Sequence, residues 1–199
     1  MKILEIEQGS PEWHQARCGL PTASCFDKII DATGKQSKSR KKYLYQLAGE
    51  RITGKAEETY QNGAMLRGKE MEGEARELYE LVTGETVQQV GLCLADGKFQ
   101  YGASPDGLVG EDGGLEIKCP LIVNAVTYLI DGKLPSDYFQ QVQGQLLVTG
   151  RKWVDFLSYY PGMKPLLIRI LPDPEFQQLL KAELESFCKE LDLIVETIK

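Results

Sequence analysis

The sequence predicts an α/β or α+β fold in which helices flank a central sheet. Apolar residues recur at helical spacing up to residue 84, at a period of two over residues 86–118, and at helical spacing again after residue 120. A chain that runs from helices to strands and back buries its apolar surfaces by covering the sheet with its helices. With 199 residues and no repeat, low-complexity segment or dividing linker, we expect residues 1–199 to form a single domain.

The amino-terminal part predicts helices. We expect residues 1–20 to be irregular, with Trp13 as an anchor, and a first helix to begin just after Pro21, where Thr22 or Ser24 can cap it. Apolar spacing then predicts two further helices, over about residues 40–53 and 64–82.

The middle of the chain predicts consecutive strands that end in a hairpin. Its second strand carries Leu115 and Ile117 toward a core, so Glu116 and Lys118 lie together on the opposite face. The remaining segments predict helices over about 121–131 and 136–149, strands in 152–160 and 165–171, and a long helix over about 174–198.

Composition limits the function classes. The five cysteines are scattered and the chain has one histidine, His14, which argues against a structural zinc site and a disulfide framework and favours a reduced, cytoplasmic setting. We find no secretory signal and no apolar segment long enough to span a bilayer. The net charge of −6 does not favour nucleic acid, but one short basic run could still bind phosphates locally; it contains Lys35, Lys38, Arg40, Lys41 and Lys42.

The hairpin also carries a pattern suited to metal chemistry. Asp106 precedes the first strand, and the turn brings it alongside Glu116 and Lys118. Two converging carboxylates repel unless a cation joins them, and oxygen ligands suit Mg²⁺ or Mn²⁺. A neighbouring lysine can then stabilise negative charge or help to deprotonate water in phosphodiester hydrolysis. A Glu–Lys pair on an exposed strand face remains the alternative interpretation.

Four blocks of sequence resemble the phage lambda exonuclease (YqaJ-like recombinase) family of PD-(D/E)xK nucleases. They are SPDG with LEIKCP in residues 104–120, EWHQARCGLPTAS in 12–24, RGKEMEGEAR in 67–76 and YFQQVQGQLLVTG in 138–150. The resemblance implies a restriction-endonuclease-like central mixed sheet flanked by helices. It also implies a metal-dependent 5′→3′ exonuclease that digests one strand of double-stranded DNA to mononucleotides and leaves a 3′ single-stranded tail.

The resemblance implies the following metal centre. Asp106 and Glu116 would be the principal ligands of two Mg²⁺ ions, for which Mn²⁺ could substitute, and the carbonyl of Ile117 would complete one site. Lys118 would assist the attacking water, and Asp96 would lie beside the metals.

Two further groups complete this centre. The resemblance implies that Glu72 holds a metal-bound water and that Gln141, or also Gln143, orients the water or the scissile phosphate. From the sequence alone, Glu72 could equally be a solvated acid, and Gln141 with Gln145 could form an exposed helix face.

A second implied site would bind the DNA end. Arg17, Ser24 and Ser104 would hold the 5′-phosphate, although Arg17 could also be a surface arginine and Ser24 a helix cap. Met65 would insert as a wedge between the end base pairs. The basic run described above would line a DNA channel.

The resemblance also implies partners. The family works as a homotrimeric ring on double-stranded DNA ends and passes its product to a single-strand annealing protein. The open alternatives are an endonuclease of the same superfamily, of the restriction or junction-resolving type, a catalytically inactive DNA-binding module, and a scaffold in which the hairpin is purely structural.

Overall fold

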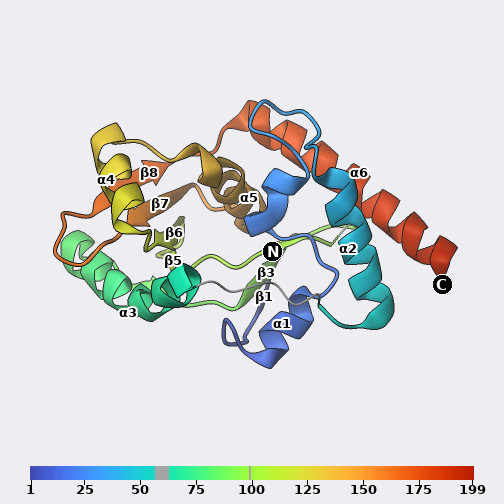
Figure 1. The fold of residues 1–199 in the computed structure, drawn as a ribbon, viewed down its shortest axis with the longest axis horizontal. Helices are drawn as coiled ribbons and strands as arrows, with labels where there is room; N and C mark the ends of the chain where they lie inside the picture. Colours follow the sequence, from blue (N-terminus) through green and yellow to red (C-terminus); the bar gives the residue numbers. More distant parts are fainter. Residues whose placement is uncertain (57–62, 99) are drawn as a thin grey trace.

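The computed structural model describes residues 1–56, 63–98 and 100–199, with the side chains of residues 63–65 excepted. Figure 1 shows the arrangement of the elements. In chain order they are β1 (Lys2–Leu4), α1 (Pro11–Arg17), the 3₁₀ helix η1 (Ala23–Lys28), α2 (Arg40–Thr53), α3 (Gly63–Thr83), β2 (Val87–Gln88), β3 (Leu92–Leu94), β4 (Gly102–Ala103), β5 (Gly107–Val109), β6 (Gly113–Lys118), α4 (Ile122–Asp131), the 3₁₀ helix η2 (Ser136–Tyr138), α5 (Phe139–Thr149), β7 (Trp153–Ser158), β8 (Leu166–Ile170) and α6 (Pro174–Ile198).

A mixed five-stranded sheet carries Glu116 and Lys118 on its strand β6. Its strand order is β2-β5-β6-β7-β8, and only the central pair β6–β7 is parallel. The hairpin β5–β6 pairs Gly107 with Leu115 and Val109 with Gly113, and Gly110 makes its turn with a positive φ of 51°. A smaller sheet in the described residues has the order β1-β3-β4.

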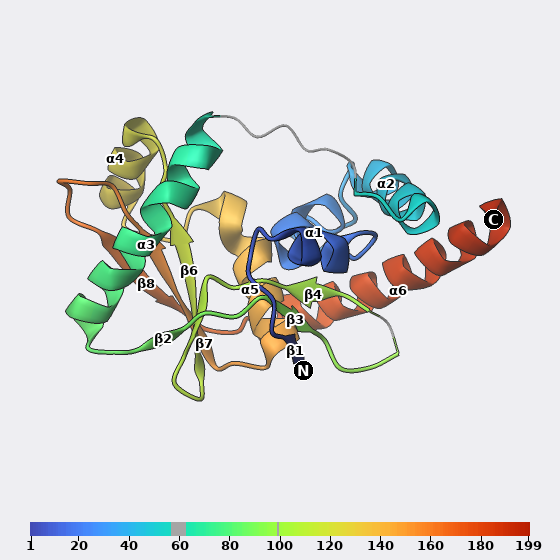
Figure 2. The same ribbon diagram turned by 90° about the horizontal axis from the view of Figure 1, so that it is seen from below.

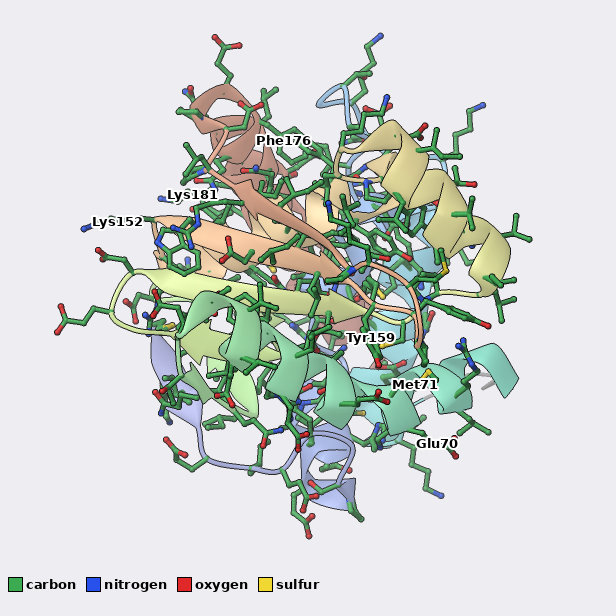
Figure 3. All side chains as sticks on the ribbon, turned by 90° about the vertical axis from the view of Figure 1, so that its left-hand side faces the viewer. Glu70, Met71, Lys152, Tyr159, Phe176 and Lys181 are labelled. Carbon is green, nitrogen blue, oxygen red and sulfur yellow. The ribbon has the colours of Figure 1, made fainter. Side chains whose placement is uncertain are left out.

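Helices cover both faces of the five-stranded sheet. On one face, Ala75 and Tyr79 of α3 pack in a core cluster with Leu115 and Ile117 of β6. Figure 3 shows α3 lying across this sheet. On the other face, a cluster of Val142 and Leu146 from α5 with Val154 and Phe156 from β7 fills the interior. The predicted α/β fold with a flanked central sheet is therefore confirmed.

The largest core cluster lies beside that sheet. It joins side chains from α2, α6, η1, β3 and β4, including Phe26, Leu44 and the fully buried Leu184. Figure 2 shows α1, α2 and α6 on the opposite side of the molecule from α3 and α4, with the carboxy-terminal end of α6 extending outward. None of the helices in the described ranges is long and apolar enough to cross a membrane.

Most predicted elements agree with the structure, and two expectations are corrected. Residues 1–20 contain β1 and α1, and α1 is capped by Ser10, whose side chain accepts a hydrogen bond from the Trp13 amide. The helix expected after Pro21 is the short 3₁₀ helix η1, and Thr22 makes no side-chain capping bond to it. Short polar-apolar segments of this kind carry too few turns for apolar periodicity to define them.

Candidate active site

The strand β6 divides its side chains between the two sheet faces. Leu115 and Ile117 are buried against α3, whereas Glu116 and Lys118 face α5. Glu116 has only 1% of its surface exposed. The face opposite α3 is therefore not solvated, because α5 covers it, and a buried carboxylate there needs partners.

Asp106 joins this strand from the neighbouring one. It directly precedes β5, so the hairpin register places it opposite Glu116, and the Ile117 amide donates to Asp106 Oδ2 at 2.6 Å. Because the N–H and C=O of one strand residue point to the same side, the Ile117 carbonyl also faces Asp106. That carbonyl lies beyond the last paired residues of the hairpin, Gly107 and Leu115.

Glu116 is held by three donors. Lys118 forms an ion pair with Glu116 Oε1, and Gln141 Nε2 donates to the same oxygen at 2.6 Å. Gln145 Nε2 donates to Oε2. Gln143 points elsewhere, since its amide donates to the Leu171 carbonyl at 2.9 Å. Of the two glutamines that the resemblance implied, the structure brings Gln141 to the cluster and not Gln143.

Glu72 reaches the same region from α3. It pairs with Arg76 one helical turn later at 2.5 Å. Glu72 and Asp106 both line a hollow with a volume of about 760 Å³, which Trp13 and His14 of α1 bound from the other side. The cluster therefore opens into a space between α3 and the amino-terminal segment.

The charges in this cluster are not balanced. Burial and the nearby charge of Glu116 raise the pKa of the Asp106 carboxyl well above its ordinary value; Glu72 adds to the rise, and Lys118 and the Ile117 amide oppose it. Burial disfavours the charged form of Lys118, but Glu116 and Asp106 outweigh it and raise the pKa of that amine. Lys118 therefore stays positively charged, and this single amine faces two carboxyl groups, Asp106 and Glu116.

The donor set suits a divalent cation. Mg²⁺ prefers oxygen ligands and binds in proteins through one or two carboxylates, while water or phosphate oxygens complete its shell. Asp106, Glu116 and the Ile117 carbonyl supply such oxygens, and the raised pKa of Asp106 marks negative charge that a cation would neutralise. Among the described residues, no three His, Cys, Asp or Glu side chains are already grouped as ligands. In the structure, Lys118 and two glutamine amides contact the oxygens of Glu116.

Asp96 is placed differently from the expectation. Its carboxylate pairs with the amino terminus of Met1 at 2.5 Å and is 82% exposed. The β3–β4 ladder explains the separation, because Leu94 pairs with Gly102 and Cys93 with Ala103. Asp96 follows one end of this ladder and Asp106 follows the other, so we correct the expectation that Asp96 lies beside the metals.

The three residues expected to bind the end phosphate do converge. Arg17 donates from Nη1 to Ser104 Oγ at 3.1 Å and from Nη2 to Ser24 Oγ at 3.2 Å. Two neighbours to which the sequence pattern gave other roles, Thr22 and Trp13, complete this candidate phosphate pocket. Thr22 accepts from Arg17 Nη2 at 3.1 Å, and the ring of Trp13 lies 4.1 Å from the guanidinium carbon while its Nε1 donates to Ser104.

No acidic side chain pairs with Arg17 in this candidate phosphate pocket among the described residues. Burial lowers the pKa of the Arg17 guanidinium, and its hydrogen bonds go to the hydroxyl groups of Ser104, Thr22 and Ser24. A half-buried guanidinium surrounded by hydroxyls is a site at which an anion would restore charge balance.

The structure leaves one expected DNA contact, Met65, untested and places another, Arg40, in the interior. The side chain of Met65 lies outside the described part of the chain. Arg40 is buried and pairs with Glu190 at 2.6 Å and with Glu183 at 3.6 Å on α6, so the expectation that it contacts DNA is corrected. The other members of the basic run are exposed and stay candidates; they are Lys35, Lys38, Lys41 and Lys42.

A helix-flanked mixed sheet with Asp106, Glu116 and Lys118 on one hairpin defines the restriction-endonuclease-like class of nuclease folds. Residues 12–152 match the family model of the YqaJ-like viral recombinase domain, and the chain belongs to this family. No curated protein matches the chain.

Solved structures agree with this assignment. The alkaline exonuclease LHK-Exo from Laribacter hongkongensis is 36% identical, with a TM-score of 0.87 over 95% of this chain and 96% of that one. The same protein in complex with dAMP gives 36% identity and a TM-score of 0.87 over 96% of both chains. A phage-related exonuclease from Haemophilus somnus 129PT, 15% identical, shares the fold with a TM-score of 0.69 over 90% of this chain and 96% of that one.

Proposed function

We propose that the protein is a metal-dependent 5′→3′ exonuclease. It would digest one strand of linear double-stranded DNA to mononucleotides and leave a 3′ single-stranded tail for annealing. Its family membership and the 36% identity with an alkaline exonuclease support a nuclease role. The polarity, the substrate and the metal rest on the geometry of the two sites.

The spacing between the phosphate pocket and the carboxylate cluster carries this proposal. Ser104 accepts from Arg17, and Asp106, two residues later, lies beside Ile117 of β6. Two residues span at most about 7 Å, so a phosphate held at Ser104 lies within the length of one nucleotide from Asp106. A terminal phosphate bound there would place the next phosphodiester bond at the carboxylates, which yields mononucleotides from a 5′ end.

The residues of the centre would share the work of hydrolysis. Asp106, Glu116 and the Ile117 carbonyl would hold Mg²⁺, with Mn²⁺ as a substitute and two ions per site, and the bound cation would supply Lewis-acid polarisation and a more acidic water. Lys118, which keeps its charge, would stabilise the negative charge that develops on the phosphate. Gln141 would orient the water or the phosphate.

A labelled linear duplex tests the proposal. With Mg²⁺, a 5′-phosphorylated duplex should lose mononucleotides from the 5′ ends and retain a 3′ tail, whereas EDTA should stop the reaction. A covalently closed circle is the matched substrate and should remain intact. Cleavage of the circle would favour the endonuclease alternative, and an absence of metal-dependent cleavage would favour a binding module.

The phosphate pocket makes a separate prediction. Arg17→Ala should reduce the preference for 5′-phosphate over 5′-hydroxyl ends by about 10- to 100-fold, because one charge-assisted phosphate contact is worth roughly 1.5–3 kcal/mol. Arg151→Ala is the control, since Arg151 donates to the Gly110 carbonyl on the hairpin turn. An unchanged end preference in Arg17→Ala would remove Arg17 from end recognition.

The partners remain part of this proposal. Family resemblance supports a homotrimeric ring on double-stranded DNA ends and a single-strand annealing protein that receives the product. A ring would reconcile the net charge of −6 with DNA binding if exposed lysines such as Lys38 and Lys42 faced the channel. Light scattering of the purified chain should give the mass of three copies.

A further inference from the structure

A second glutamine lies beneath the carboxylate cluster. Gln145 is one helical turn after Gln141 on α5 and donates from Nε2 to Oε2 of Glu116. It is 1% exposed, whereas Gln141 and Lys118, which contact Oε1, are both partly accessible. Gln145 therefore contacts Glu116 from the interior of the protein and is too deeply buried to reach a substrate.

The other end of this amide is left unsatisfied. Gln145 Oε1 is buried and has no hydrogen-bond partner among the described residues. A buried acceptor without a partner destabilises a fold, and an apolar side chain of the same shape would avoid this cost. The orientation of the amide follows from Glu116, because turning it would direct Oε1 at a carboxylate oxygen.

The neighbouring Gln143 shows what a purely structural glutamine looks like on the same helix. It is equally buried, at 1% exposed, but both ends of its amide are used. Its Nε2 donates to the Leu171 carbonyl at 2.9 Å, and its Oε1 accepts from the Asp173 amide at 2.9 Å. These bonds fasten α5 to the segment that leads into α6.

We infer that Gln145 is a positioning residue for Glu116 that sets the affinity of the site for its divalent cation. By holding Oε2 from below, it fixes the carboxylate so that Oε1 is directed toward the accessible side, where Lys118 and Gln141 lie. Groups that orient a ligating carboxylate change metal affinity when they are removed. This inference rests on the proposed function in one respect, namely that Glu116 is a cation ligand.

Two isosteric variants on one helix test it. Gln145→Met should weaken Mn²⁺ binding, measured by calorimetry on the metal-free protein without DNA, by tenfold or more. Gln143→Met should leave Mn²⁺ affinity within about twofold of wild type, because its partners are remote from the cluster. Thermal unfolding in EDTA should rank the two in the opposite order. Gln143→Met removes the side-chain partners of two backbone groups, the Leu171 carbonyl and the Asp173 amide, whereas Gln145→Met removes an unsatisfied acceptor together with a bond.

Further variants and measurements distinguish a failure of this inference from a failure of the proposed function. Gln145→Asn keeps an amide that is one methylene too short for Glu116, so it should show the same loss of affinity and serves if Gln145→Met is unstable. Exonuclease activity of Gln145→Met should recover toward wild type at saturating Mg²⁺. Unchanged Mn²⁺ affinity in both Gln145 variants, or an equal loss in Gln143→Met, would overturn the inference. Wild-type protein that neither binds Mn²⁺ nor digests linear duplex would instead overturn the proposed function.

Discussion

Two buried carboxylates lie on adjacent strands of the five-stranded sheet, on opposite faces and with different partners. Glu116 on β6 is 1% exposed, and Asp155 on β7 is 3% exposed. Asp155 is paired in register with Leu115, so it lies on the α3 face of the sheet, while Glu116 lies on the α5 face. Arg169 donates to both oxygens of Asp155 at 2.9 Å, and the Tyr79 hydroxyl donates to one of them at 2.8 Å.

The difference lies in how the charge is compensated. Asp155 has a guanidinium in a two-bond geometry and a hydroxyl, which is a complete set of partners for a structural ion pair. Glu116 shares one lysine with Asp106, and Glu72 adds further negative charge. Removing one partner of a buried ion pair destabilises a fold, whereas the surplus of buried negative charge around Asp106 is the feature on which we propose a cation site.

The largest expected effect is on catalysis. Asp106→Asn keeps an acceptor for the Ile117 amide but removes one negative charge, so metal-dependent digestion should fall by about 10²- to 10³-fold, the scale of losing one group that stabilises a transition state. Unfolding of the metal-free variant should need as much urea as wild type or more, because the lost charge is unfavourable there. Retained activity would remove Asp106 from the proposed metal site.

The next expected effect is on stability, with little effect on catalysis. Asp155→Asn should lower the free energy of unfolding by about 2 kcal/mol, less than the 3–5 kcal/mol of a fully buried pair because Arg169 is half-exposed. Chemical denaturation measures this loss, and exonuclease activity of the folded variant should stay within a few-fold of wild type. A large loss of activity without a loss of stability would contradict the structural role given to Asp155.

The contrast also shows what could be predicted from the sequence. Periodicity identified every main helix from α2 onward and the Asp106–Glu116 hairpin, because those features depend on local spacing. Periodicity could not distinguish Glu116 from Asp155, since each is one acid between apolar neighbours on a strand. The distinction comes from partners distant in the sequence, such as Gln145 and Arg169.

Some roles were missed for other reasons. Trp13 lies four residues before Arg17 on α1 and Thr22 five residues after it, but the sequence pattern gave them the roles of an anchor and a cap, and Gln145 was considered only as part of an exposed helix face. Asp96 was misplaced because spacing along the chain does not show that an antiparallel ladder separates it from Asp106. The one signal available for Gln145 was its position four residues after Gln141, which places both amides on one side of a helix.

The effect with the smallest change per step is a dependence of stability on pH. Burial and Glu116, with Glu72, raise the pKa of the Asp106 carboxyl in the fold, while the unfolded chain restores its ordinary value near 4. Between these two pKa values the native protein binds the proton that the unfolded chain has lost. The contribution of Asp106 to stability therefore decreases as pH rises from about 4 through the raised pKa, by at most about 1.4 kcal/mol per pH unit for one proton.

Urea unfolding in EDTA at a series of pH values measures this slope. Wild type should lose stability relative to Asp106→Asn as the pH rises, and the two curves should become parallel once Asp106 is fully ionised. Saturating Mg²⁺ should remove the difference in slope for wild type at neutral pH, because the cation compensates the carboxylate in place of the proton. Parallel curves over the whole range without metal would show that the charge near Asp106 is as fully compensated as that of Asp155, and the contrast between the two carboxylates would no longer hold.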